Sequence, residues 1–280
     1  MSIIWRGIKV GILFSFTLAL VFSGGLFGAL LYGKVSGKEW ALYDQPIVYA
    51  QEPEESESSD TGEIVDAQTV QEAEPVKPER KPSARISAPA IRQFPELPSG
   101  CEVTSLTMLL NFYGIDINKV QLAEQMPKDE TPIEWDKNGE ISYWGNPNIG
   151  FVGEVTNKGK GFGIYHGPLL ELMKEYIPTG IDLTGEPWEE IERHVSTGIP
   201  VIVWTTVNFK TALKWVVWDS PLGPIRTTFS EHAVLLVGYD DDYVYVNDPW
   251  NGKENLRVDK KIFLKTWEVM GKQAITYTES

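Results

Sequence analysis

The sequence SGCEVTSLTMLLNFYG, from Ser99 to Gly114, decides how the folded part of the chain begins. Apolar and aromatic side chains recur in it at helical spacing: Val103, Leu106, Leu110 and Tyr113. Gly114 follows the last of them and is a typical helix stop. The stretch therefore predicts one amphipathic helix that starts at the cysteine.

Around this helix, helix-like and strand-like segments alternate without an internal repeat. Further helices are predicted over 118–125, 168–176, 187–196 and 261–270. Strands are predicted over 200–207, 232–239, 243–246 and 274–278. Because helices come first and strands follow, the predicted fold class is α+β, with an N-terminal helical part packed on a C-terminal antiparallel sheet.

Cys101 is the only cysteine among the 280 residues, so an intramolecular disulfide and a multi-cysteine metal site are excluded. At the start of a helix, unpaired N–H groups and the positive end of the helix dipole favour the thiolate over the thiol. Gly100 is expected to leave the approach to the sulfur open. The alternative is that Cys101 is a small, buried, apolar residue.

His232 opens an apolar strand, where a polar ring has no packing role, and Asp248 ends the next strand. If the two strands pair through the turn at 240–242, the carboxylate reaches the imidazole. This pattern predicts Cys101 as nucleophile, His232 as general base and Asp248 as the group that orients the histidine. Asn247 is the second candidate for that orienting group, but strand alternation points it to the opposite face.

An oxyanion intermediate also needs hydrogen-bond donors. Gln93, upstream of the cysteine, is the candidate side chain, together with the backbone N–H of Cys101. The alternative is that Gln93 is a solvated loop residue.

Several separated motifs occur in one order along the chain: QFPELPSGCEVTSL (93–106), WGNPNIGFVG (144–153), GIPVIVW (198–204), EHAVLLVGYD (231–240) and VNDP (246–249). From about residue 91 onward they resemble the papain-like cysteine peptidases related to bacteriocin leader (double-glycine) peptidases, in the stand-alone branch called peptidase family thirty-nine-like. The resemblance implies a papain-like fold, a peptide or protein substrate, and the roles given above to Cys101, His232, Asp248 and Gln93. The chain has no Walker-type Gly-rich loop, unlike the leader peptidases that are fused to transporters.

Substrate-binding residues are predicted at Gly100 and in a Gly/aromatic loop that contains Trp144, Asn146 and Gly150. The alternative for this loop is an insertion packed on the domain. Trp204, Trp215 and Trp218 could add an aromatic wall, although core packing explains Trp204 more simply.

The formal net charge of −14 argues against nucleic acid or an anionic membrane surface as a partner. With three histidines and one cysteine, a zinc site is poorly supplied, although counting alone leaves a His/carboxylate site open. No metal site and no cofactor are expected. His166 and His194 have no partner at catalytic spacing and are expected to be structural or surface residues.

Residues 10–33 carry no charge and are predicted to form a transmembrane signal-anchor helix, with residues 1–9 as a cytoplasmic tail. The alternative is a cleaved signal peptide. Residues 34–87 are predicted to be an acidic, disordered stalk, and residues 88–280 the peptidase domain. Gly24 and Gly28 form a G-x-x-x-G pair that could support a weak homodimer, unless these are incidental small residues.

These features together predict a single-pass protein of a bacterial cell membrane, whose extracytoplasmic domain is a cysteine peptidase. Two alternatives stay open at this level. One is an acyltransferase or transglutaminase-like enzyme on the same fold, and the other is a non-catalytic binding module displayed on the surface.

Overall fold

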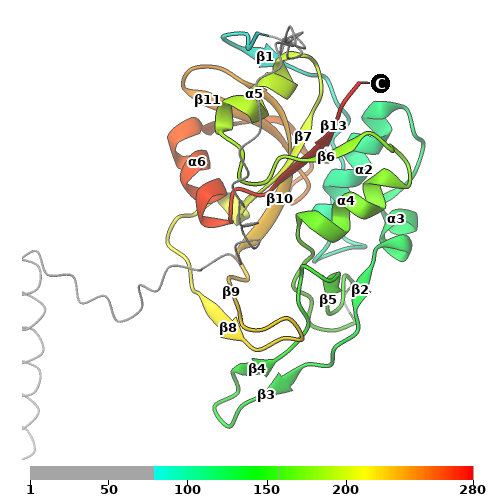
Figure 1. Cartoon of the computed structure of the whole chain (residues 1–280), viewed down its shortest axis with the longest axis vertical. Coiled ribbons are helices and arrows are strands. Elements are labelled where there is room, and N and C mark those ends of the chain that lie inside the picture. Colours follow the sequence, from blue (N-terminus) through cyan, green and yellow to red (C-terminus); the bar gives the residue numbers. More distant parts are fainter. Residues whose placement is uncertain (1–78, 157, 280) are drawn as a thin grey trace, which may run out of the picture. The chain divides into compact units, whose positions relative to one another are not determined.

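The computed structural model describes residues 79–156 and 158–279, and its centre is an antiparallel sheet (Figure 1). The strands lie in the order β12-β11-β10-β7-β13-β6, with β1 paired to the far end of β10. Their bounds are Lys253–Asp259 (β12), Tyr243–Asp248 (β11), Glu231–Tyr239 (β10), Val201–Thr206 (β7), Ala274–Tyr277 (β13), Gly180–Asp182 (β6) and Ala84–Arg85 (β1). β7 and β10 are buried along their whole length, which explains the apolar runs Val201–Trp204 and Ala233–Val237 within them.

Helices cover both faces of this sheet (Figure 1). Their bounds are Cys101–Tyr113 (α2), Lys119–Gln125 (α3), His166–Lys174 (α4), Trp188–Ser196 (α5) and Lys260–Val269 (α6). α2 and α4 pack together on one face, where Trp204 of β7 donates a hydrogen bond to the carbonyl of Ile164. α5 and α6 meet on the other face through the edge-to-face pair Trp188–Trp267. This arrangement confirms the predicted α+β class.

Short elements beside the sheet build a second, smaller apolar cluster. They are β2 (Lys128–Asp129), β3 (Glu134–Trp135), β4 (Ile141–Tyr143), β5 (Phe151–Val152), β8 (Val216–Trp218) and β9 (Ile225–Thr227). The 3-10 turn Val207–Phe209 packs on the main core instead. The cluster consists of Ile141, Trp144, Val152, Phe162 and Trp218. These strands have only two or three residues each, too few to show a clear alternation in the sequence.

α2 begins at Cys101 and ends where Gly114 takes a left-handed conformation with φ of 104°, as its sequence predicts. The helix is not amphipathic over most of its length, however, because every residue from Cys101 to Leu110 is buried. It lies between the sheet and the other helices, so even its polar face is covered. Glu102 therefore points into protein rather than into water.

The domain begins earlier than the boundary expected at Ala88. β1 pairs with β10, Ile86 is buried, and Arg80 forms an ion pair with Glu192 at 2.7 Å. Residues 79–87 are polar in composition and so were assigned to the stalk, but the edge of β10 binds them through backbone hydrogen bonds that composition does not report.

The other predicted segments of the N-terminal region lie outside the described residues: the tail 1–9, the helix 10–33 with Gly24 and Gly28, and the stalk as far as residue 78. Within residues 79–156 and 158–279, none of the helices has the length and apolar character needed to cross a membrane.

Candidate active site

The β10–β11 hairpin brings His232 and Asp248 together. His232 is the second residue of β10, Asp248 is the last of β11, and the two strands are antiparallel. His232 Nε2 lies 2.8 Å from Asp248 Oδ1, and both side chains are buried. Since Nε2 is engaged by the carboxylate, Nδ1 is the ring nitrogen left to act as a base.

Asp248 is itself held in place by its neighbours. The Trp250 N–H donates to Oδ1 at 2.9 Å, and Asn251 Nδ2 donates to Oδ2 at 2.8 Å. Asn247 points the other way, as strand alternation predicts, and donates to the carbonyls of Ala88 and Pro89. Asp248, and not Asn247, is therefore the residue that contacts the imidazole.

Cys101 is placed by the packing of α2 on β10, where Ser105 Oγ donates to the carbonyl of Ala233 at 3.1 Å. Cys101, His232 and Gln93 line one cavity of about 250 Å³. Cys101 is buried as a residue, yet it forms part of the wall of this cavity. A carbonyl group that entered the cavity would meet the thiol and the imidazole together.

Two carboxyl groups lie beside the thiol. Cys101 Sγ donates to Glu102 Oε2 at 3.2 Å, and one ligand atom each of Cys101, Glu102 and Glu231 lies within 4.8 Å of the others. Burial, followed by the charges of Glu102 and Glu231, raises the pKa of the Cys101 thiol well above its ordinary value. The sequence predicted the opposite direction from the helix dipole alone, because it could not foresee that both carboxyls turn inward.

Gln93 is buried, so its interpretation as a solvated loop residue is wrong. Its Nε2 donates to the carbonyl of Pro98 at 2.7 Å, while Oε1 has no hydrogen-bond partner among the described residues. An amide nitrogen carries two hydrogens, so one remains for another acceptor in the cavity.

None of the four residues predicted to bind substrate lines the cavity of Cys101. A Cβ at Gly100 would lie 2.7 Å from Leu97 Cβ, and one at Gly150 would lie 2.8 Å from backbone atoms of Lys128. Trp144 packs against Trp218, and Asn146 donates to Ser220 Oγ at 2.9 Å. The Gly/aromatic loop is thus an insertion packed on the domain, which was the alternative interpretation.

The comparisons with known proteins agree with this architecture. The model of the Peptidase_C39 like family matches residues 85–275, which is more than half of the chain. The chain belongs to the Peptidase_C39 like family. This protein is therefore a cysteine peptidase-like hydrolase with a papain-like α+β fold.

Two relatives document the family resemblance. The uncharacterized protein YvpB of Bacillus subtilis (strain 168) is 42% identical over 182 residues, which are 65% of this chain and 70% of YvpB. The crystal structure of a Bacillus anthracis protein described as a C39-like peptidase superposes with a TM-score of 0.64 at 38% identity, and the match covers 71% of this chain and 98% of that one.

Sequence reasoning missed a groove beside the cavity of Cys101. The groove has a volume of about 480 Å³ and shares Phe229 and Ser230 with the cavity. Trp135 and Trp215 line it, and Lys160 lies over the rings of Trp135 and Phe229 at 5.1 and 4.4 Å. Of the three predicted wall tryptophans, only Trp215 lines this groove, since Trp204 and Trp218 are buried. Its residues come from short strands and loops far apart in the chain, so no local sequence pattern predicts it.

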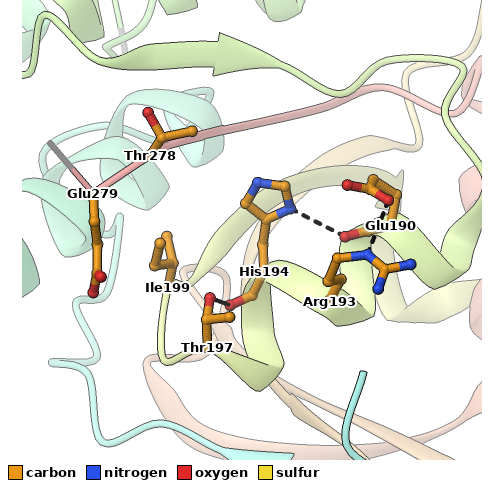
Figure 2. A pocket seen from close by; sticks show the side chains of 7 residues that line it. All are labelled: Glu190, Arg193, His194, Thr197, Ile199, Thr278 and Glu279. Atoms are coloured by element: carbon orange, nitrogen blue, oxygen red, sulfur yellow. Dashed lines mark hydrogen bonds and ion pairs between the residues drawn. The ribbon is translucent and has the colours of Figure 1, made fainter. Parts of the chain in front are cut away.

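A second cavity, of about 330 Å³, lies at the C-terminal end of α5 (Figure 2). His194 Nδ1 contacts the carbonyl of Glu190 in its own helix at 3.1 Å, and Arg193 Nε contacts the Glu190 carboxylate at 3.1 Å. His166 pairs with Asp182 at 2.7 Å, elsewhere on the domain. Both histidines thus contact residues outside the cavity of Cys101.

Proposed function

We propose that this protein hydrolyses peptide bonds with Cys101, His232, Asp248 and Gln93 as its catalytic residues. One observation carries the proposal: the imidazole that Asp248 holds at 2.8 Å and the thiol of Cys101 open into the same cavity. A nucleophile, a base and a group that orients the base are what thiol catalysis requires.

The reaction would proceed through an acyl-enzyme. His232 Nδ1 takes the proton of the thiol, and the sulfur attacks the peptide carbonyl carbon. Gln93 Nε2 and the Cys101 N–H, which has no intrahelical acceptor at this position, stabilise the oxyanion. The imidazolium returns the proton to the departing amine, and water then hydrolyses the thioester, regenerating the thiol and releasing an acid.

The adjoining groove is the region that we assign to substrate residues near the scissile bond. Its exposed aromatic side chains offer apolar contact area, and Lys160 and Lys214 add positive charge. An extended peptide in the groove would reach the cavity through the shared residues Phe229 and Ser230.

Cleavage of a peptide library by the full chain tests this function. Wild type should yield new peptide termini, and Cys101→Ala should yield none while keeping its circular dichroism spectrum. Added amines should not become attached to the products, because attachment would indicate acyl transfer. Equal cleavage by wild type and Cys101→Ala would overturn the proposal.

We further propose that residues 10–33 anchor the chain in the membrane and that residues 34–78 carry the domain on the outer side of a bacterial cell. The support is the uncharged length of 10–33 and the positive residues Arg6 and Lys9 before it. The domain should fractionate with membranes, be digested by protease added to intact cells, and become detached when residues 10–33 are deleted. Protection from external protease would contradict the orientation. Gly24→Leu with Gly28→Leu should weaken any crosslinked dimer.

A further inference from the structure

Two buried glutamates lie next to the catalytic candidates both along the chain and in space. Glu102 follows Cys101, and Glu231 precedes His232. The solvent-exposed fraction is 0% for Glu102 and 6% for Glu231. Buried carboxyls of this kind are ordinarily paired with a cation.

Within residues 79–156 and 158–279, neither glutamate forms an ion pair with lysine or arginine. Glu102 accepts hydrogen bonds from the Ile164 N–H at 2.9 Å and from the Cys101 thiol. Glu231 Oε1 has no partner at all among these residues.

Gly163 allows the two carboxyls to approach each other. A Cβ at this residue would lie 2.3 Å from Glu102 Oε1 and 3.0 Å from Glu231 Oε2, so a larger residue would displace these carboxyls from their present positions. Two carboxylates this close, away from water, do not both ionise readily, and the pair retains a proton to a higher pH than either would alone.

We propose that Glu102 and Glu231 share one proton, and that the loss of this proton suppresses the ionisation of Cys101. The proposal rests on the proposed function, in which Cys101 is the nucleophile. The two glutamates are positioning residues, since they act through the thiol. With the proton in place, the cluster carries one negative charge, and transfer of the thiol proton to His232 adds a second. Without the proton, a thiolate would be a third negative charge within a few ångströms.

The other groups around the pair do not relieve this charge. Tyr165 faces both carboxyls, and burial raises its pKa, so it stays neutral and donates its hydroxyl to Thr227. The Ala233 N–H lowers the thiol pKa, but burial and the two glutamates outweigh it. His232 is bound to Asp248, and Lys210 lies in the wall of the same cavity. Burial raises the pKa of Glu102 to about 7 and raises that of Glu231 well above its ordinary value.

The rate of Cys101 alkylation by iodoacetamide, measured on the full chain from pH 5 to 9.5 with EDTA present, tests the proposal. EDTA ensures that the proton, and no metal cation, neutralises the pair. Glu231→Gln and Glu102→Gln keep the side-chain size but leave a single carboxyl. The ratio of variant rate to wild-type rate should rise with pH and reach about tenfold or more at pH 9, since one unit of thiol pKa is a factor of ten in thiolate.

Glu154→Gln, at an exposed glutamate, is the matched control, and its ratio should stay near one throughout. Infrared spectra at pH 7 supply a second readout: wild type should show a protonated carboxyl band that Glu231→Gln lacks. A ratio that does not change with pH would overturn the proposal, as would an unchanged infrared band. If Glu102→Gln fails to fold, Glu231→Gln carries both measurements.

Alkylation needs no substrate, so the two ideas fail separately. If the alkylation ratio does not depend on pH while Cys101→Ala abolishes peptide hydrolysis, the shared proton is rejected and the proposed peptidase function is retained. If the alkylation ratio depends on pH but no peptide is cleaved, the shared proton is supported and the peptidase function is rejected.

Discussion

At the scale of single residues, the orientation of one imidazole depends on Asp248, whose two oxygens accept from three donors: His232, the Trp250 N–H and Asn251. These contacts leave the carboxylate no freedom to turn away from the ring. The orientation of the His232 ring is therefore set by the carboxylate and by the short turn that follows β11.

Substitution of Asp248 should separate orientation from charge. Asp248→Ala removes the acceptor for Nε2–H and should lower kcat/KM by about a hundredfold or more. Asp248→Asn keeps one oxygen as acceptor for the ring. Its kcat/KM should decrease by about tenfold, because the contact with Asn251 is broken. Peptide hydrolysis by both variants, compared at equal thermal stability, checks that Asp248→Ala loses more activity than Asp248→Asn. Equal losses would mean that the charge alone matters.

Gln93 is the second residue whose role can be measured alone. Gln93→Ala should reduce kcat by about 10²–10³-fold and leave KM nearly unchanged, because an oxyanion donor acts only in the transition state. Steady-state kinetics on one peptide checks this, and Cys101 alkylation should persist in the variant. A change confined to KM would argue for substrate binding instead.

At the scale of elements, the edge strand β1 ties the segment before Ala88 to the sheet. Gly238 makes this close approach feasible, since a Cβ there would lie 2.7 Å from the carbonyl of Ala84. Tyr239 adds a hydrogen bond to the carbonyl of Lys81. The segment is therefore part of the domain.

Two shortened chains test the boundary. A chain that starts at Ala88 should be less stable than one that starts at Glu79, by about 2–3 kcal/mol from the lost burial of Ile86 alone. Urea unfolding followed by tryptophan fluorescence measures the difference. Equal midpoints would show that β1 adds nothing to stability.

At the scale of the whole molecule, the buried glutamates make stability depend on pH. Burial raises the folded-state pKa of Glu102 to about 7 and that of Glu231 well above its ordinary value. At these two groups the native state therefore binds more protons than the unfolded chain above about pH 4.5. Stability from these groups is fully present below the unfolded pKa and is lost as pH rises through the folded pKa.

The urea concentration at the unfolding midpoint of wild type should accordingly decrease as the pH is raised from 5 to 8. In Glu231→Gln this decrease should be smaller. Each unit of pKa difference corresponds to about 1.4 kcal/mol. Equilibrium unfolding at several pH values, with Glu154→Gln as control, provides the comparison. A midpoint that rises over this interval in wild type would contradict the predicted sign.

The sequence alone determined the helix that starts at Cys101, the α+β order of elements and the pairing of His232 with Asp248. These depend on periodicity, on turn residues and on the register of one short hairpin, which are local properties. Only the tertiary structure decided that α2 is buried on every side, that the Gly/aromatic loop is packed, and that Glu102 meets Glu231 beside the sulfur. The physical reason is that burial and the charges of neighbours far along the chain control a pKa, and both exist only after folding.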